Sequence, residues 1–315
     1  MSFFTSQTVT PAEKILEGIY IIIGLLCLYT SVKNFKDKNN ATPIGTAVFW
    51  GILGVVLALG RWIPPKFSGA LIIAMAIPAI VKRVKPGSDK GPSEEETRQN
   101  FAAIGMKVFV PAFSIGIFAL VFAVFTKLGA LVGCGVGVFV AVILLIAFNS
   151  KSNTPKVFLD DSARMLSMVG PLSMLPMLLA SLGAIFTAAG VGQVIAKLVG
   201  NVIPAGNMTV GIIVYALAMM IFTMIMGNGF AAITVITVGI GAPFVLQYGA
   251  NPVVIGMLGL TCGYCGTLCT PMAANFNIVP VAMLEMKDKW GVIKQQIPIA
   301  LVLIVVQIVL MIFLK

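Results

Sequence analysis

Side chains able to bind an ion or a carboxylate gather at two places in the last third of a very apolar chain. The first is Gly227-Asn228-Gly229, and the second lies between Thr261 and Asn277; both interrupt long hydrophobic stretches near their middle. The candidates at the second place are Gly263, Gly266, Thr267, Thr270, Pro271, Asn275 and Asn277. Amides, hydroxyls and main-chain groups freed by glycine and proline can hold a carboxylate or a sodium ion without a formal charge. The alternative is that these residues only form hydrogen bonds between helices.

The composition is that of a protein embedded in a lipid bilayer. Hydrophobic residues make up 59% and charged residues 10% of the chain, and the mean hydropathy is +1.03. About a quarter of the residues of a soluble domain are charged. We predict an all-α polytopic membrane protein with about seven to eight transmembrane helices plus a re-entrant hairpin and a discontinuous helix. In such a protein the positions of the charges matter more than their sum of +10, because they set the topology, and we expect no nucleic-acid partner.

The first region, residues 1–150, is predicted to hold five membrane helices that form a scaffold. Windows of about twenty apolar residues mark them, at Ile15–Ser31, Ile44–Leu59, Phe67–Val81, Val108–Phe125 and Ala130–Phe148. The longest polar loop runs from Lys82 to Lys107 and contains Ser93 followed by three glutamates, a pattern typical of the start of a short helix.

The second region, residues 151–315, is predicted to hold the transport repeat. A sixth span is expected over Leu166–Thr187 despite its two prolines, after a polar loop that includes Asp160 and Asp161. The shorter and more polar stretch Val191–Ile203 is typical of an arm helix that lies in the membrane interface. A hairpin over Met208–Tyr248, a broken helix over Pro252–Met286 and a last span over Ile297–Leu314 complete the chain.

The stretch Met208–Tyr248 is long enough for two full spans, but a re-entrant hairpin is favoured. Its tip at Gly227-Asn228-Gly229 carries no charge and is shorter than the other connections. Main chain that is broken at membrane depth is tolerated only where protein buries it or where it lines a polar cavity. Paired interruptions of this kind indicate the binding site of a secondary transporter.

The positions of the cations predict the orientation. When the loops around Lys33, Lys82, Lys151 and Lys287 are placed in the cytoplasm, they hold 15 of the 21 lysines and arginines. This arrangement puts both termini outside. We expect a multi-pass protein of the bacterial cytoplasmic (inner) membrane.

The residues that most enzymes and metal centres need are missing from the spans. The chain contains no histidine, which excludes imidazole bases, ligands and proton relays. The spacing of Cys262, Cys265 and Cys269 resembles a metal cluster, but it lacks a fourth ligand nearby. Carboxylates inside the spans are scarce as well, so sodium coupling through oxygen ligands is favoured over proton coupling. We therefore expect no enzyme and no cofactor, with Na⁺ as the candidate coupling ion.

Two sequence runs resemble a known group of transporters. They are MGNGFAAITVITVGIGAPF and GANPVVIGMLGLTCGYCGTLCTPMAANFNIVP, and they resemble the carboxy-terminal repeat of the ion transporter superfamily. This superfamily includes the divalent-anion sodium symporters, the citrate transporters and the membrane subunits of TRAP transporters. The whole chain is similar to bacterial domain-of-unknown-function family 979, which is usually encoded beside a second small membrane protein and often near enzymes of pyroglutamate metabolism.

The resemblance implies one subunit of a two-component, ion-coupled secondary transporter with an elevator-like mechanism. Its substrate would be a small organic anion, with pyroglutamate (5-oxoproline) or a related carboxylate or amino acid as the specific expectation. The first five spans lack a matching pair of interruptions, since Gly133-Cys134-Gly135 has no amide or Thr-Pro element. The second membrane protein would then supply the other half-site in a hetero-oligomer, such as a dimer of heterodimers. The alternatives are a non-transporting assembly subunit and an intramembrane enzyme.

Overall fold

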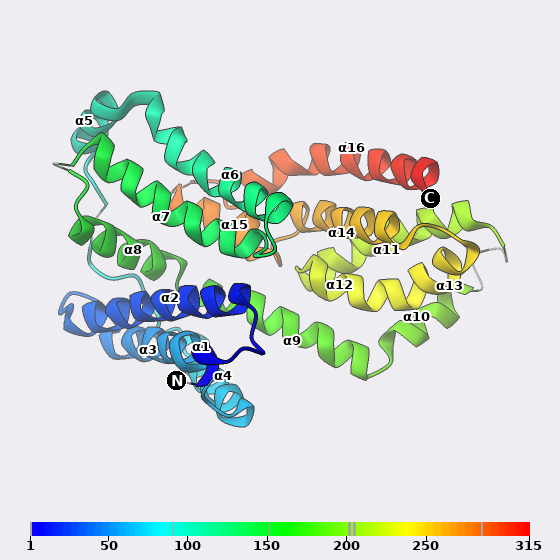
Figure 1. The fold of residues 1–315 in the computed structure, drawn as a ribbon, viewed down its shortest axis with the longest axis horizontal. Coiled ribbons are helices and arrows are strands. Elements are labelled where there is room, and N and C mark those ends of the chain that lie inside the picture. Colours follow the sequence, from blue (N-terminus) through cyan, green and yellow to red (C-terminus); the bar gives the residue numbers. More distant parts are fainter. Residues whose placement is uncertain (1, 90, 151, 201–202, 204–205, 285) are drawn as a thin grey trace. The chain divides into compact units, whose positions relative to one another are not determined.

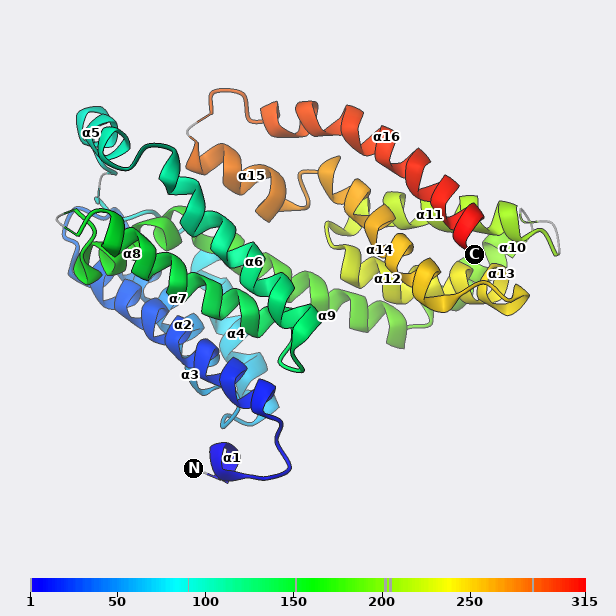
Figure 2. The same ribbon diagram turned by 45° about the horizontal axis from the view of Figure 1, so that its top comes forward.

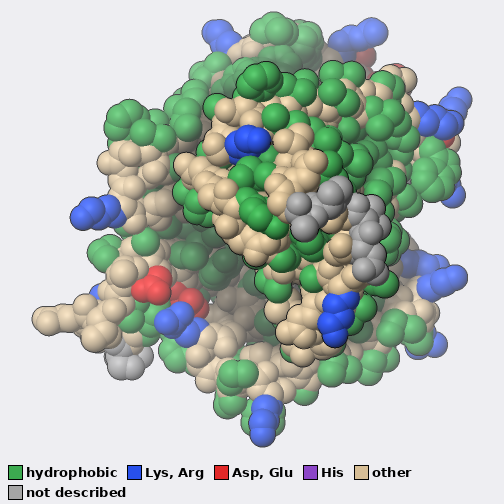
Figure 3. All heavy atoms as spheres, turned by 90° about the vertical axis from the view of Figure 1, so that its right-hand side faces the viewer, with side chains coloured by type: hydrophobic (Ala, Val, Ile, Leu, Met, Phe, Trp, Pro, Cys, Tyr) green, Lys and Arg blue, Asp and Glu red, His purple; other side chains and the backbone are tan. Residues whose placement is uncertain are grey.

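The computed structural model describes the chain except for residues 1, 90, 151, 201–202, 204–205 and 285 (Figure 1). The described residues form helices and turns without a β-strand. Within this described part of the chain, six helical stretches are long and apolar enough to cross a membrane: Pro11–Lys36, Glu94–Phe125, Ala130–Phe148, Met208–Met226, Gly229–Tyr248 and Gly291–Leu314. The protein therefore has the all-α polytopic membrane fold that the composition predicts. Figure 3 shows one face on which hydrophobic side chains cover much of the surface.

The chain divides into two compact units, Met1–Gly170 and Pro171–Lys315. The sequence places the division about twenty residues earlier, because it takes residues 149–164 for a polar loop. These residues instead include most of α8 (Pro155–Val169), which packs on α2 (Pro11–Lys36) of the first unit. The roles of scaffold and transport repeat stay predictions.

The first unit contains two helical pairs held together by small residues. Gly24 of α2 lies against the main chain of α3, since a Cβ at Gly24 would lie 2.6 Å from the amide nitrogen of Ala58. In the second pair, Gly137 of α7 lies equally close to Ile115 of α6. Such contacts are typical of membrane helices, where close main-chain approach replaces the hydrophobic effect. The helices of this unit are α1 (Ser2–Thr5), α2, α3 (Pro43–Leu59), α4 (Pro65–Ile80), α5 (Glu94–Ile104), η1 (Gly105–Val108), α6 (Phe109–Phe125), α7 (Ala130–Phe148) and α8.

The start of α5 confirms one local prediction, and the end of α8 corrects another. Ser93 accepts a hydrogen bond from the amide of Glu96, whose side chain accepts from the amide of Ser93, so the predicted cap forms a capping box. The predicted single span over Leu166–Thr187 is wrong. α8 stops at Val169, because Gly170 has a positive φ of 53° and the following proline lacks an amide hydrogen.

The second unit contains a helical hairpin and the predicted broken helix (Figure 2), and the re-entrant position of the hairpin stays a prediction. The hairpin consists of α11 (Met208–Met226), a two-residue tip, and an outer arm that begins with α12 (Gly229–Ile236). The broken helix consists of α14 (Pro252–Leu268) and α15 (Ala274–Met283). The other elements are η2 (Gly170–Met174) at the junction of the units, α9 (Leu175–Ala188), α10 (Val191–Gly200), η3 (Thr237–Gly241), α13 (Ala242–Phe244), η4 (Leu246–Tyr248) and α16 (Gly291–Leu314).

The stretch predicted as an interfacial arm helix forms α10, although part of its predicted end lies outside the described residues. α10 packs closely on the π-helical turn η3 of the hairpin. The two main chains approach at Gly192 and Gly239, where a Cβ added to Gly239 would lie 2.6 Å from the carbonyl oxygen of Gly192. A position in the membrane interface stays a prediction.

The core of the second unit lies where α11, α12, α14 and α16 meet. Tyr215 is fully buried, donates or accepts a 2.9 Å hydrogen bond with Thr237, and lies directly against Gly259 of α14. Gly266 of the same helix lies against the carbonyl oxygen of Met220. These glycines let α14 approach the inner arm of the hairpin, which brings the tip and the helix break to the same place.

Candidate functional site

The hairpin tip is built by Gly227 and Asn228. Gly227 ends α11 in the left-handed conformation, with φ of 72°, and Asn228 begins α12 in an extended conformation. The side-chain oxygen of Asn228 accepts hydrogen bonds from the amides of Phe230 at 2.8 Å and Ala231 at 3.3 Å. Since an asparagine oxygen that caps a helix is already used, the free group of Asn228 is its NH₂, which can only donate.

The helix break is closed by Asn277. Its side-chain amide donates to the carbonyl oxygens of Thr267 at 2.7 Å and Thr270 at 2.6 Å. These oxygens lie at and just beyond the carboxyl end of α14, where Pro271 cannot continue the helix. Asn277 is 1% exposed, so its amide satisfies carbonyls that water does not reach.

The break is tied to the tip by two further contacts. The hydroxyl of Thr270 donates to the carbonyl oxygen of Met224 in the inner arm at 2.8 Å. Gly227 lies against the main chain of Met272, since a Cβ at Gly227 would lie 2.5 Å from the Met272 carbonyl oxygen. The tip and the break therefore form one structural site.

A pocket of about 180 Å³ opens at this junction. Its walls include an edge-to-face aromatic pair, Phe230 and Tyr264, with ring centroids 6.1 Å apart. Its polar side chains are those of Asn228, Tyr264, Thr267 and Asn275. The residues that line it are Gly227, Asn228, Gly229, Phe230, Tyr264, Thr267, Met272, Ala274, Asn275 and Phe276.

Two helices begin at the pocket, and two others, α11 and α14, end beside it. The first residues of α12 and of α15 are among its lining residues, and no side chain caps the amino end of α15. A helix amino end carries roughly half a positive charge and offers unpaired amides. None of the described residues that line the pocket is charged. The uncapped amino end of α15 thus offers amides to an anionic group, whereas the carboxyl ends of α11 and α14 offer carbonyl oxygens that suit a cation.

The ten residues proposed from the sequence fall into two groups. Five line the pocket: Gly227, Asn228, Gly229, Thr267 and Asn275. The other five shape it from outside: Gly263 and Gly266 pack on α11, and Thr270, Pro271 and Asn277 build the break.

Sequence reasoning missed the aromatic walls and one buried hydroxyl. Tyr264 is the one aromatic side chain between Thr261 and Pro271, and this isolation is a signal that could have identified it. Phe230 directly follows the hairpin tip, and Phe276 lies in the first turn of α15, just after the break. Thr223 of α11 is fully buried near Gly263, and its hydroxyl has no hydrogen-bond partner among the described residues. No local pattern distinguishes Thr223 from the apolar residues around it.

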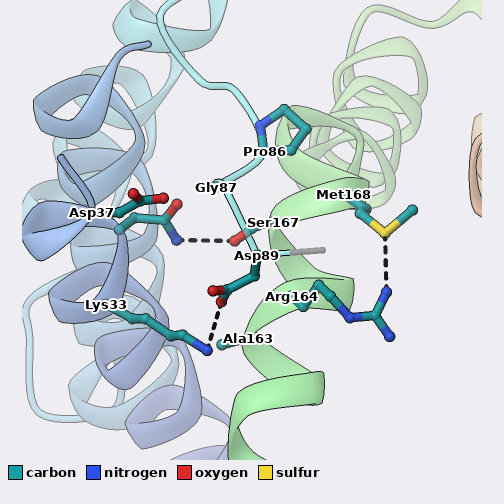
Figure 4. A pocket seen from close by; sticks show the side chains of 10 residues that line it. Lys33, Asp37, Pro86, Gly87, Asp89, Ala163, Arg164, Ser167 and Met168 are labelled. Carbon is teal, nitrogen blue, oxygen red and sulfur yellow. Dashed lines mark hydrogen bonds and ion pairs between the residues drawn. The ribbon is translucent and has the colours of Figure 1, made fainter. Parts of the chain in front are cut away.

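A second polar cluster lies in the first unit, on α2 and α8 (Figure 4). The ammonium group of Lys33 lies 2.7 Å from carboxylate oxygens of both Asp89 and Asp160. The hydroxyl of Tyr29 donates to Asp160 at 2.8 Å. The hydrogen bond from Lys33, followed by that from Tyr29, holds the pKa of Asp160 below its ordinary value. Asp160, predicted to lie in a loop, is thus a helical residue, and it shares Lys33 with Asp89 of the loop between α4 and α5.

The same loop is held by Asp37 at the end of α2. The carboxylate of Asp37 accepts from the amide of Ser88 at 2.6 Å and from its hydroxyl at 2.8 Å. The amide of Ser88 is the main reason why the pKa of Asp37 is low. The neighbouring Asn34 donates to Ser167 of α8 at 2.9 Å. The pocket between these side chains measures about 40 Å³, so the cluster serves as a clamp between α2, α8 and the loop.

The fold and the site define a polytopic all-α membrane protein in which a helical hairpin meets a broken helix around a small pocket. The family whose model matches the chain is described as "Protein of unknown function (DUF979)", and the match covers residues 17–315. The chain belongs to this family, as its similarity to domain-of-unknown-function family 979 predicts. Searches of the curated proteins and of the solved structures find no match.

Proposed function

We propose that the protein is one subunit of a two-component secondary transporter for a small organic anion. The observation that carries this proposal is the pocket at the junction of the hairpin tip and the helix break. Two discontinuous elements that meet at a polar pocket are the usual arrangement for substrate binding in secondary transporters. The relationship to the ion transporter superfamily, inferred from the tip and the Thr-Pro break, is part of the proposal.

The substrate is a small molecule with one carboxylate, and pyroglutamate is the specific candidate. At about 180 Å³, the pocket is smaller than the roughly 300–1,000 Å³ of most ligand pockets. The uncapped amino end of α15 at the pocket offers main-chain amides to a single carboxylate. The NH₂ group of Asn228 is placed to donate to the carboxylate, and the rings of Phe230 and Tyr264 suit a compact, partly apolar body.

The second component is a small membrane protein encoded nearby, which completes the half-site that this chain offers. Phe230, Met272 and Phe276 line the pocket yet are 60%, 51% and 43% exposed. Exposed aromatic side chains beside a polar pocket support a protein surface that covers them during part of the cycle. Movement of the hairpin and the broken helix against a scaffold, driven by a sodium gradient, then alternates access to the two sides of the inner membrane.

Uptake of labelled pyroglutamate into proteoliposomes that hold both proteins tests the proposal. We expect accumulation that depends on an inward sodium gradient and that unlabelled small monocarboxylates suppress. A folded complex that takes up neither pyroglutamate nor any member of a panel of carboxylates and amino acids would favour a non-transporting assembly subunit.

A further inference from the structure

An apolar groove lies in the first unit between α2 and α7. It measures about 700 Å³, and none of its described lining residues is charged. Its walls include Ile23 and Phe139, which are 40% and 50% exposed. On α2 the groove extends from Leu16 to Tyr29, a length of about 20 Å at the usual helical rise. One leaflet of a bilayer holds about 15 Å of hydrocarbon, so the groove is long enough for an acyl chain.

The groove adjoins a polar pocket of about 410 Å³, and Tyr29 lines both. The charged residues of this pocket are two lysines and two aspartates, Lys33, Lys36, Asp37 and Asp89. Figure 4 shows three of them, Lys33, Asp37 and Asp89, near one another. Both lysines belong to the last turn of α2, and the end of a membrane helix is where lipid headgroups lie. An apolar groove that ends beside a charged pocket has the polarity of a phospholipid.

The charges of the polar pocket indicate the class of headgroup. Lys33 is shared by Asp89 and Asp160, each 2.7 Å away, so it has no charge to spare for a phosphate. Lys36 is exposed and forms no ion pair among the described residues. The side chain of Asp89 is 48% exposed. One accessible cation beside one accessible carboxylate matches a zwitterion, which carries one charge of each sign.

We propose that the groove and the adjoining pocket bind one molecule of phosphatidylethanolamine. An acyl chain lies between α2 and α7, and the ammonium group of Lys36 binds the phosphate. The ethanolamine ammonium group donates hydrogen bonds to the carboxylate of Asp89 and the hydroxyl of Ser88, which both line the pocket. A choline headgroup has no N–H to donate there. The site is built from the first unit alone and does not depend on the proposed transport function.

Thermal unfolding of the delipidated full-length protein in detergent tests this site. Phosphatidylethanolamine, phosphatidylcholine and phosphatidylglycerol with identical acyl chains are added in turn, and each raises the midpoint only as far as it binds the native state. The affinity for phosphatidylethanolamine should be about tenfold higher than for the other two, because they lack its ammonium donor. Equal stabilisation by all three lipids overturns the site. Equal stabilisation by soluble phosphoethanolamine would assign the polar pocket to a soluble ligand and overturn it as well.

Two pairs of variants locate the lipid. Val138→Trp fills the groove and should abolish the stabilisation, whereas Val121→Trp, at a similarly exposed position of α6 outside the groove, should keep it.

Lys36→Gln removes the partner of the phosphate and should weaken lipid binding about tenfold. Lys38→Gln is its control, because Lys38 is exposed and does not line the pocket. A wild-type lipid response in folded Val138→Trp and Lys36→Gln overturns the proposal. Loss of association between protein chains in Val138→Trp, with lipid binding unchanged, would assign the groove to a protein helix and overturn it too.

Discussion

Gly227 at the hairpin tip lies against the carbonyl group of Met272 in the helix break, and this contact joins the two interrupted elements. A Cβ on Gly227 would lie 2.5 Å from the Met272 oxygen, and the φ of 72° at Gly227 already disfavours any other residue. The pocket forms because the tip can come this close to the break.

The Gly227→Ala variant is therefore expected to separate the tip from the break. A left-handed alanine costs about 1–2 kcal/mol, and displacement of Met272 adds to this cost. We expect a lower free energy of unfolding and loss of substrate binding. Gly249→Ala is the control, because Gly249 has a φ of 94° but nothing within 4 Å of its would-be Cβ. Equal loss of binding in both variants would show that backbone strain, and not the contact with Met272, matters.

Two glycines of α14 should respond oppositely to alanine. A Cβ at Gly266 would collide with the carbonyl oxygen of Met220, so Gly266→Ala should destabilise the second unit by about 1–3 kcal/mol. Gly256 has no atom within 4 Å of its would-be Cβ, so Gly256→Ala should be neutral or stabilise by up to about 1 kcal/mol. Thermal unfolding in detergent measures both, and a destabilising Gly256→Ala would contradict this packing of α14.

The clamp of the first unit should open in acid. The pKa values of Asp160 and Asp37 are lower in the folded protein than the usual value of about 3.9. Their stabilising contribution is therefore complete above about pH 4 and is lost as the pH falls through their lowered pKa values. Hydrogen exchange of the amides of Lys85 and of residues 87–89, corrected for the intrinsic rate, should accelerate over that range.

The same loop should loosen at neutral pH in Asp89→Asn, which removes the loop's own carboxylate from Lys33. Asp161→Asn is the control, since Asp161 pairs with Arg164 in its own helix at an exposed position. Equal hydrogen-exchange rates of the loop amides in the two variants would contradict a clamp at Lys33.

The sequence predicts the parts of the site that depend on local backbone chemistry. Glycine beside asparagine at the tip, and threonine before proline in the break, are signals that act within a few residues, and both interruptions occur as predicted. The capping box at Ser93 is predictable for the same reason. Local signals also mislead: the apolar run after Arg164 reads as one span, but Gly170 ends the helix there.

Contacts between distant residues could not be predicted. Lys33 and Asp160 are 127 residues apart, and nothing in the chain indicates which carboxylate Lys33 meets. Sequence reasoning also assigns Asn228 and Asn277 the same role as ligands. The structure separates them, since one caps α12 beside the pocket and the other spans the break behind it.

The most direct test of the account is pyroglutamate uptake by Asn228→Ser, compared with Asn251→Ser. Both asparagines cap helices through their side-chain oxygens, and Asn251 does so at α14 without lining the pocket. Serine keeps the capping oxygen and removes the NH₂ donor. A donor to a carboxylate contributes roughly 1.5–3 kcal/mol, so Asn228→Ser should lower uptake roughly tenfold to a hundredfold, while Asn251→Ser stays near wild type. Wild-type uptake by a well-folded Asn228→Ser would contradict a substrate site at the hairpin tip.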